Sequence, residues 1–454
     1  MSIIWAEQAL TSNGWAKDVR IKIGADGRIS DIKANRTPEG LRVGALMPAP
    51  ANSHSHAFQR AMAGLTERRG ENKTDSFWTW RHLMFRFLDA LTPEQVQAIA
   101  ALVQMEMLEA GFATNVEFHY LHHQPGGVPY DQIGEMAERI VAAAETSGIG
   151  LTLLPVHYQF GGCDQRPLAP GQVRFGNDPD RFARMIEASR AALTVLPDDA
   201  NLGVAPHSLR AVGQSALRRA AELVPDGPVH LHLAEQIPEV EEIQASWHAR
   251  PVEWALDNLP LDDRWCLIHL TQMLPYETET LAKTGAVAGL CPLTEASLGD
   301  GIFRAVRWMD AGGRISIGSD SNIRISLAEE LRQLDTSQRL RDHSRAALAS
   351  TEHSTGRRMI DAISAGGAQA AGRGAGKVEV GAWADLLALD TDHLDLTGLQ
   401  GDTLLDSFVF TGDNRMVTDV WSAGRHMVQH GRHIHRDKIA AAYRKAVKPL
   451  RDGL

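Results

Sequence analysis

Histidines that could bind a metal ion occur as a closely spaced pair early in the sequence. His54 and His56 follow the apolar, proline-punctuated run of residues 45–50. Residues two apart on an extended strand point to the same side, so these two imidazoles could hold one ion between them. A surface turn would explain the same pair without a metal, and the pair alone therefore does not establish a site.

A second segment that could bind a metal ion is His230-Leu231-His232-Leu233-Ala234-Glu235. A histidine at a strand end, followed three residues later by an acid, could supply a third metal ligand and a proton carrier. Either histidine could instead be a hydrogen-bonded core residue.

Two further polar residues, His269 and Asp320, end apolar runs later in the chain. Taken singly, a histidine at a strand end is more often a core residue, and an aspartate after Gly-Ser is usually a helix cap. Together and in this order, the four groups are much more specific and favour a metal-dependent hydrolytic site.

The elements that would position these residues alternate between short β-like runs and longer helical patterns, which is typical of parallel strands wrapped by helices. Thr92-Pro93-Glu94 predicts the start of a helix over 92–110. In a TIM barrel the carboxyl ends of the strands surround the active site, where we expect the polar residues above to meet. The predicted strands are 151–156, 202–205, 229–233, 266–269, 286–290 and 315–319.

Both ends of the chain have a different sequence pattern, in which short β-like runs are separated by turn signals. The runs are Ile3–Trp5 and Val19–Ile23 near the N-terminus, and Val378–Val380, Leu386–Leu389 and Val417–Trp421 near the C-terminus. We therefore expect an α/β fold with a small β domain built from both termini. The predicted domains are 1–46 and 373–454 for the small domain, the latter with a terminal helix, and 47–372 for a (β/α)8 barrel.

Composition limits the classes of partner. The chain has 454 residues, 44% of them hydrophobic, a formal net charge of -10 and three widely separated cysteines, Cys163, Cys266 and Cys291. No run of Lys or Arg could neutralise successive phosphates, so a nucleic-acid partner is not expected. The cysteine spacing argues against disulfides and a thiolate zinc site. With no signal-like N-terminus and no membrane-length apolar stretch, we expect a cytoplasmic protein without a membrane partner.

The order HxH, His, His and Asp at successive strand ends resembles the amidohydrolase superfamily, and the HxxE formed by His232 and Glu235 resembles its deaminase branch. The resemblance covers nearly the whole chain, because members also build a small β-sandwich domain from both termini. It implies zinc ligands, namely His54, His56, His232 and Asp320. It also implies that Glu235, His269 and Asp320 act in catalysis beside the metal.

The distribution of lysine bears on the number of metal ions, because binuclear members of the superfamily usually bridge two ions with a modified lysine. No lysine occurs from residue 74 through residue 282, which favours one zinc ion per subunit. Glu117 could bridge two ions instead, but we interpret it as a supporting or structural residue. A His-rich site with a carboxylate could also take another divalent metal.

Zinc held in this way lowers the pKa of a bound water from about 15.7 toward about 7, which prepares it for attack on an electrophilic carbon. Glu235 would then carry a proton to the departing nitrogen, and His269 and Asp320 would take or orient the proton of the water. The predicted enzyme is a hydrolase that releases ammonia from a C=N-type carbon.

Three longer motifs narrow the resemblance: HSHAFQRAMAG from His54, FWTWRHLMFRF from Phe77 and APHSLR from Ala205. Together they resemble the bacterial deiminases that hydrolyse N-formimino-L-glutamate to N-formyl-L-glutamate and ammonia in histidine breakdown. This resemblance implies a small anionic substrate and suggests a homodimer. It also implies five substrate-binding residues, which are Gln59, Arg81, Tyr120, His207 and Arg210. A bidentate pair between Arg210 and a substrate carboxylate would suit the guanidinium, although a surface ion pair would explain this arginine equally well.

Three alternatives remain open. A purine or other cyclic-amidine deaminase could use the same zinc and Glu235 with a flat aromatic pocket, although two arginines argue mildly against it. A binuclear amide-ring hydrolase is disfavoured by the missing lysine. A metal-binding or scaffolding protein that has lost activity is disfavoured because each expected catalytic position holds a chemically competent residue.

Overall fold

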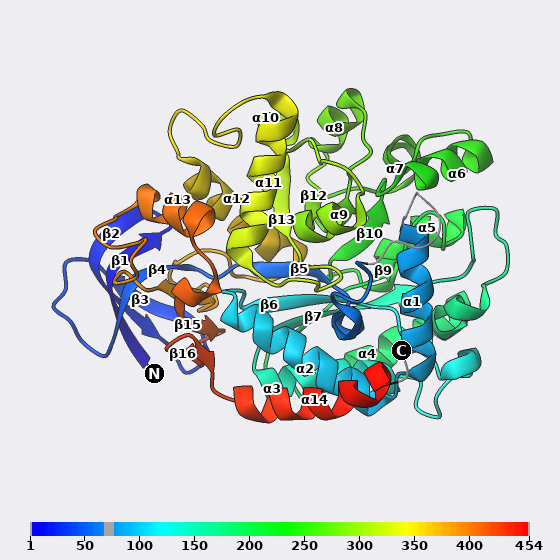
Figure 1. The fold of residues 1–454 in the computed structure, drawn as a ribbon, viewed down its shortest axis with the longest axis horizontal. Coiled ribbons are helices and arrows are strands. Elements are labelled where there is room, and N and C mark those ends of the chain that lie inside the picture. The colour runs from blue at the N-terminus through cyan, green and yellow to red at the C-terminus, as the bar shows by residue number, and fades with distance from the viewer. Residues whose placement is uncertain (1, 68–76, 453–454) are drawn as a thin grey trace.

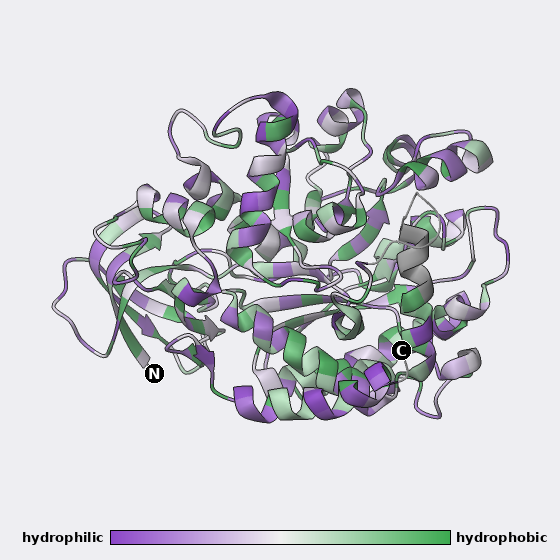
Figure 2. Cartoon of the chain, viewed as in Figure 1, coloured by the Kyte–Doolittle hydropathy of each residue, from purple (hydrophilic) through white to green (hydrophobic). Residues whose placement is uncertain are grey.

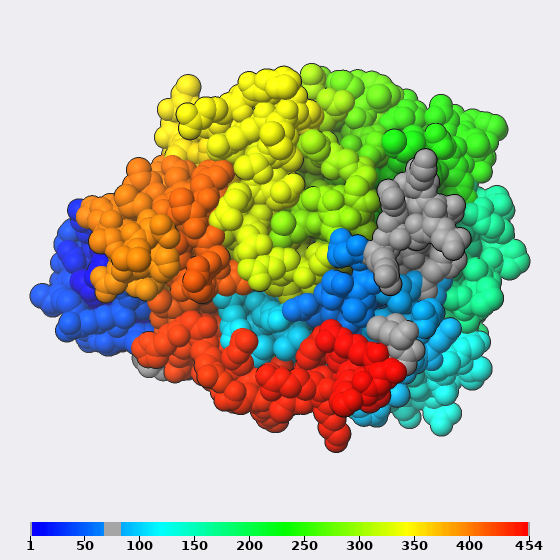
Figure 3. Space-filling model, viewed as in Figure 1, coloured from blue at the N-terminus to red at the C-terminus, as the bar shows by residue number. Residues whose placement is uncertain are grey.

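The computed structural model describes residues 2–67 and 77–452, and the side chains of 2–67 and 83–452. The chain forms two sheets, a parallel one in the middle of the sequence and a smaller mixed one made from both ends (Figure 1). Blue N-terminal and orange C-terminal segments lie side by side at one end of the molecule (Figure 3). The predicted α/β class, with a barrel and a small domain from both termini, is confirmed.

The parallel sheet closes into a barrel. Its strand order is β10-β11-β12-β13-β5-β6-β7-β8, and each pairing is parallel. β9 pairs with β7, and the bridges Val204–Val229 and Ser208–His232 join the β8–β9 segment to β10. The two short strands therefore act as one interrupted strand that completes the ring. The barrel strands are β5 (Ala51–Ser55), β6 (Thr114–His119), β7 (Gly150–His157), β8 (Asn201–Leu202), β9 (Ala205–Pro206), β10 (Val229–Leu233), β11 (Trp265–His269), β12 (Val287–Leu290) and β13 (Arg314–Ile317).

Helices surround the barrel and carry green and purple residues side by side, as expected for helices with one buried face (Figure 2). The helices are α1 (Phe77–Ala90), α2 (Pro93–Glu109), α3 (Glu135–Ser147), α4 (Pro179–Leu193), α5 (Gln214–Leu223), α6 (Ile237–Trp247), α7 (Pro251–Asn258), α8 (Pro275–Leu281), α9 (Pro292–Leu298), α10 (Ala305–Asp310), α11 (Leu327–Asp342), α12 (Thr355–Ala370), α13 (Asp402–Thr411) and α14 (Arg436–Asp452). Short 3-10 helices span Ala57–Met62, Pro125–Gly127, Pro170–Phe175 and Asn414–Met416.

The predicted start of α2 is confirmed in detail. The Thr92 hydroxyl accepts the N–H of Gln95 at 3.3 Å, and the Gln95 side chain accepts the N–H of Thr92 at 3.0 Å. This reciprocal pair satisfies two backbone donors that the first turn of a helix would leave unpaired.

The small sheet has the order β17-β16-β15-β14-β4-β1-β2-β3. The sheet is curled: the turn at Gly424, between β15 and β16, lies against Ile23 and Gly27, which belong to the β2–β3 part of the sheet. The curled sheet encloses a second apolar core. Its strands are β1 (Ser2–Thr11), β2 (Gly14–Ile23), β3 (Ile29–Lys33), β4 (Leu41–Pro48), β14 (Leu386–Leu389), β15 (Val417–Ser422), β16 (Arg425–Gln429) and β17 (Arg432–His433). β4 belongs to this sheet along its whole length and crosses the predicted boundary at residue 46, while the boundaries themselves stay predictions.

Two strand predictions were wrong, one altogether and one in part. Val378–Val380 is not a strand. Val378 is buried, but Val380 is exposed and leads directly into a turn at Gly381, so the segment does not extend into a paired strand. The predicted strand 202–205 is interrupted where the chain changes partner: the N–H of Gly203 bonds the carbonyl of Leu153 on β7 at 3.0 Å, and the N–H of Val204 bonds the carbonyl of Pro228, just before β10, at 3.0 Å. The interruption lets the chain bend between β7 and β10.

A buried ion-pair network joins the barrel to the small sheet. A guanidinium nitrogen of Arg373 lies 2.8 Å from a carboxylate oxygen of Asp199, on the loop before β8, and another lies 2.9 Å from Asp385, which precedes β14. Arg425 of β16 pairs with the other oxygen of Asp199 at 2.7 Å. The two parts of the molecule are thereby held by Arg373 and two aspartates that are almost completely buried, together with Arg425, which is partly exposed.

Candidate active site

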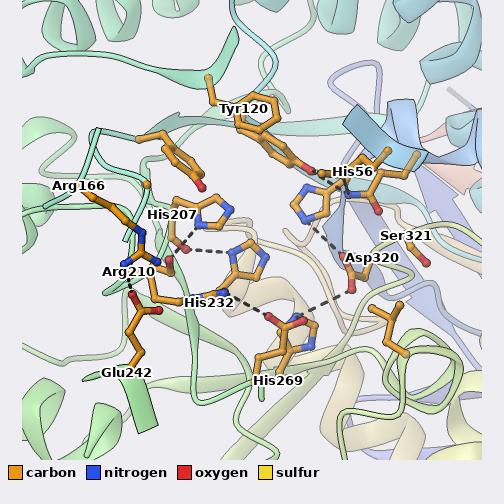
Figure 4. A pocket seen from close by; sticks show the side chains of 18 residues that line it. His56, Tyr120, Arg166, His207, Arg210, His232, Glu242, His269, Asp320 and Ser321 are labelled. Atoms are coloured by element: carbon orange, nitrogen blue, oxygen red, sulfur yellow. Dashed lines mark hydrogen bonds and ion pairs between the residues drawn. The ribbon is translucent and has the colours of Figure 1, made fainter. Parts of the chain in front are cut away.

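The four residues expected to bind metal meet at the carboxyl end of the barrel. His54 lies on β5 and His56 directly follows it, His232 lies on β10, and Asp320 follows β13. The Nε2 atoms of His54 and His232 are 3.1 Å apart. An oxygen of Asp320 lies 3.5 Å from Nε2 of His54 and 3.3 Å from Nε2 of His56. Figure 4 shows His56, His232 and Asp320 pointing toward one centre.

Hydrogen bonds to backbone carbonyls turn two of the imidazoles toward that centre. Nδ1 of His56 lies 3.1 Å from the carbonyl oxygen of Phe118, and Nδ1 of His232 lies 2.9 Å from that of His207. A carbonyl can only accept, so both Nδ1 atoms carry the proton and both Nε2 atoms present a lone pair inward. His230 points the other way and bonds the carbonyl of Ala370 at 2.8 Å, which makes it the core histidine of its motif.

The donor set fits a divalent cation. Burial lowers the pKa of His54 and His232 well below the usual value, and the neighbouring histidines lower it further, so both rings stay neutral. Burial likewise lowers the pKa of His56. Neutral imidazoles and a carboxylate are ligands that zinc prefers, so these four residues could hold one zinc ion.

Glu235 and His269 lie beside this cluster. Nε2 of His269 is 3.8 Å from an oxygen of Glu235 and 3.9 Å from the second oxygen of Asp320. Burial raises the pKa of Glu235, although His269 and Arg210 partly offset the rise. For His269, burial lowers the pKa, but Glu235, Glu295 and Asp320 outweigh it and raise the pKa to about 10. Because the charge of each group affects the pKa of the other, Glu235 and His269 together readily hold a proton.

The backbone around the site is strained. Ala234, His269, Leu270 and Asp320 have φ values of 53°, 75°, 55° and 43°, in the left-handed region that costs such residues about 1–3 kcal/mol each. These residues follow or end β10, β11 and β13, so the strain is concentrated where the site residues emerge.

Hydrogen bonds from buried side chains hold these bends. The carboxylate of Glu239 accepts the N–H of Ala234 at 3.2 Å and that of Glu235 at 2.8 Å. The hydroxyl of Thr271 donates to the carbonyl of Ala234 at 3.3 Å. Side-chain hydrogen bonds therefore hold both the backbone N–H groups and a backbone carbonyl of the loop that carries Glu235.

A pocket with an empty volume of about 760 Å³, its mouth included, opens over the cluster. Four of the five residues expected to bind substrate line it: Gln59, Tyr120, His207 and Arg210. The amide of Gln59 donates to the hydroxyl of Tyr120 at 2.8 Å. The fifth, Arg81, lies in α1 but outside the described side chains, as do Trp78 and Trp80 of the same motif.

Arg210 places a nearly buried guanidinium in the pocket. Its side chain is 15% exposed, one terminal nitrogen lies 3.8 Å from Glu235, and its Nε has no hydrogen-bond partner among the described residues. Burial alone would lower the pKa of Arg210, but Glu239 and Glu235 raise it, so the group is fully charged. The surface ion pair considered for Arg210 does not describe this position.

Sequence reasoning missed several residues of the pocket. Arg166 lies at its edge, 2.7 Å from Glu242 of α6 (Figure 4). Tyr158 and Ser321 also line it. Arg166 lies in a long loop and Glu242 lies on α6, both away from the strand ends, and only the fold brings them to the pocket.

Glu117 on β6 and the two histidines His122 and His123, which follow this strand, do not line the pocket. The two carboxylate oxygens of Glu117 accept the N–H of Ala57 at 2.7 Å and the side-chain amide of Asn115 at 3.2 Å, and burial raises the pKa of Glu117 to about 7. It therefore supports the turn after His56, as the structural interpretation expected. His122 and His123, by contrast, bond backbone carbonyls on neighbouring segments.

Residues 45–427 match the amidohydrolase family, and residues 1–41 match the N-terminal domain described as formimidoylglutamate deiminase HutF. The chain is 45% identical to a formimidoylglutamate deiminase of Pseudomonas aeruginosa, with all of both chains covered. It is 28% identical to a 5-methylthioadenosine/S-adenosylhomocysteine deaminase of Natronomonas pharaonis over 78% of this chain and 74% of that protein. A crystal structure of an amidohydrolase from Brucella melitensis superimposes with a TM-score of 0.94 and 48% identity, covering 99% of this chain and 100% of that one.

The chain therefore belongs to the amidohydrolase family and is a hydrolase that acts on carbon–nitrogen bonds. Within that family, the full-length match and the N-terminal domain group it with the formimidoylglutamate deiminases. An adenosine deaminase from Xanthomonas campestris with bound zinc shares the fold, with a TM-score of 0.82 and 22% identity over 99% of this chain and 98% of that one. Among the described residues, no helix combines the length and apolar character needed to cross a membrane.

Proposed function

We propose that this enzyme hydrolyses N-formimino-L-glutamate to N-formyl-L-glutamate and ammonia, using one zinc ion per subunit. The observation that carries the proposal is the close placement of a buried, raised-pKa Glu235 and the charged Arg210 beside the four-residue cluster at the barrel end. The relatives that share the whole chain length support the choice of substrate.

In this reaction His54, His56, His232 and Asp320 would hold the zinc ion. When bound, zinc activates a water molecule and polarises the carbon that the water attacks. Water adds to the formimino carbon, the bond from this carbon to the terminal nitrogen breaks, and ammonia leaves. Glu235 takes a proton from the water and delivers it to that nitrogen, a role suited to a carboxyl whose pKa is raised by burial.

The remaining pocket residues would hold the glutamate part of the substrate. Arg210 would pair with a carboxylate through its terminal nitrogens and Nε, a fork that matches the two carboxylate oxygens. Gln59, Tyr120 and His207 would contribute hydrogen bonds, and we propose Arg81 as a second contact to the anion. The two carboxylates of the substrate would thus meet positive charge within a protein of net charge -10.

A second candidate is deamination of a purine or other cyclic amidine. It is favoured by the aromatic rings of Tyr120, Tyr158 and Phe175 in the pocket and by the adenosine-type relatives. Ammonia release from formiminoglutamate, adenosine and guanine, measured on one preparation with its metal content quantified, separates the two candidates. Turnover of formiminoglutamate with one zinc per chain is expected. Rapid turnover of a purine and none of the acyclic amidine would refute the proposal, and two metals per chain would favour a binuclear hydrolase.

We further propose a cytoplasmic homodimer whose partners are small anionic substrates rather than nucleic acid or membrane. The acidic net charge and the widely separated cysteines support this setting. Sedimentation at micromolar concentration should give twice the 49.6 kDa chain mass.

A further inference from the structure

Glu295 is a buried carboxylate next to the active site, and the proposed reaction gives it no role. It lies on α9, which follows β12 at the catalytic end of the barrel, and its side chain is 5% exposed. Its Oε1 is 3.3 Å from Nδ1 of His269 and accepts the N–H of Cys291 at 2.9 Å. One carboxylate oxygen therefore contacts both the first turn of α9 and the imidazole that faces Glu235.

The contact with Glu295 determines which nitrogen of the His269 ring carries a proton toward the Glu295 carboxylate. A carboxylate accepts hydrogen bonds, so Nδ1–H faces Glu295, and Nε2 faces the oxygens of Glu235 and Asp320 at 3.8 and 3.9 Å. A carboxylate placed behind an imidazole is the arrangement that fixes ring orientation and tautomer in catalytic histidines generally.

His269 lies at a strained bend of the backbone. Its φ of 75° and that of Leu270, 55°, place two consecutive non-glycine residues in the left-handed region at the end of β11. The ring is 1% exposed and must keep its edge toward Glu235 through each turnover.

We infer that Glu295 is a positioning residue, which holds the His269 ring with Nε2 toward the reacting groups. The inference rests on the proposed function, because it assigns His269 to the chemistry. It predicts that Glu295 affects the rate of turnover through His269 and leaves substrate binding and metal content unchanged.

The competing explanation is that Glu295 only caps α9. The chain offers a matched control for this explanation in Glu330 of α11, which is also buried and accepts the N–H of Leu293 in the same first turn at 2.9 Å. Among the described residues, no hydrogen bond or ion pair joins Glu330 to His269. Glu330→Gln therefore makes the same carboxylate-to-amide change at the start of α9 without touching the imidazole.

The experiment compares zinc-loaded wild type, Glu295→Gln, His269→Asn, the double variant and Glu330→Gln in ammonia release from formiminoglutamate. Glu295→Gln should lower kcat about 10- to 100-fold at unchanged KM and zinc content. The double variant should be no slower than His269→Asn, because the effect of Glu295 passes through the missing ring. Glu330→Gln should leave kcat unchanged.

An unchanged kcat in Glu295→Gln, losses that multiply in the double variant, or an equal kcat loss in Glu330→Gln would each overturn the inference. The wild-type protein provides a test independent of these variants. Its ¹⁵N NMR spectrum should show a protonated Nδ1 for His269, assigned by its absence in His269→Asn, and an unprotonated Nδ1 would overturn the inference as well. A wild type that releases no ammonia from formiminoglutamate would instead refute the proposed function, and the NMR measurement would still test the contact.

Discussion

Arg210→Met tests whether the buried guanidinium in the pocket binds a substrate carboxylate. The Nε of Arg210 has no hydrogen-bond partner among the described residues, and its nearest terminal nitrogen lies 3.8 Å from Glu235, beyond hydrogen-bond distance. A hydrogen bond to a charged group contributes about 1.5–3 kcal/mol. At about 1.4 kcal/mol per tenfold, we expect kcat/KM to fall roughly 10- to 150-fold in Arg210→Met, mainly through KM.

The assay is ammonia release over a range of formiminoglutamate concentrations, with zinc measured on the same samples. Arg210→Lys keeps the charge beside Glu235 but loses the planar fork, so it should keep kcat and raise KM. Arg166→Met is the matched control: its side chain is 48% exposed and already paired with Glu242, and exposed pairs contribute about 0–1 kcal/mol, at most a roughly fivefold change. Unchanged saturation kinetics in Arg210→Met, or an equal loss in Arg166→Met, would contradict the assignment.

Three further predictions concern proton transfer, pH and stability. Glu235→Gln should keep zinc and fold but lose about 10²- to 10⁴-fold in kcat, because an amide cannot carry the proton, and retained turnover would remove Glu235 from the reaction. Burial lowers the pKa of His119 to about 3 and of His157 to about 4, so the unfolded chain binds protons first as pH falls below about 6.5. Each should cost about 1.4 kcal/mol of stability per pH unit down to pH 4, and urea titrations of His157→Asn should show a shallower loss than wild type. Arg373→Met leaves the buried Asp385 without its cation, although Asp199 keeps Arg425, and should lower the free energy of unfolding by about 3–5 kcal/mol, whereas an unchanged urea midpoint would show that the network contributes no stability.

Much of the barrel and of the metal cluster could be predicted from sequence because both depend on local signals. The strand β10 begins and ends where its apolar run does, and His232 follows from the alternation within that strand. Parallel strands must present their carboxyl ends at one face, so His54, His269 and Asp320 could be expected to meet although they lie far apart in the chain.

What the sequence did not reveal depends on contacts between distant segments. Glu295 stands in a first helical turn, where an acid usually only complements the helix dipole, so nothing local indicates that its carboxylate reaches His269. Arg166 becomes a pocket residue only because its loop folds against Glu242. The left-handed backbone of Ala234 and Asp320 is likewise imposed by surrounding hydrogen bonds, since neither residue type requires it.

The pairing of β4 with β14 has a consequence for how the chain is made. Residues 45–48 hydrogen-bond with residues 386–389, so the N-terminal strands leave the ribosome long before the strand that covers their edge has been synthesised. Until then β4 presents an open edge on which another chain could add a strand. A nascent chain that stalls before β14 therefore exposes an unpaired strand edge, whereas the completed chain covers this edge. Chains that terminate early should therefore aggregate and should not form a smaller active enzyme.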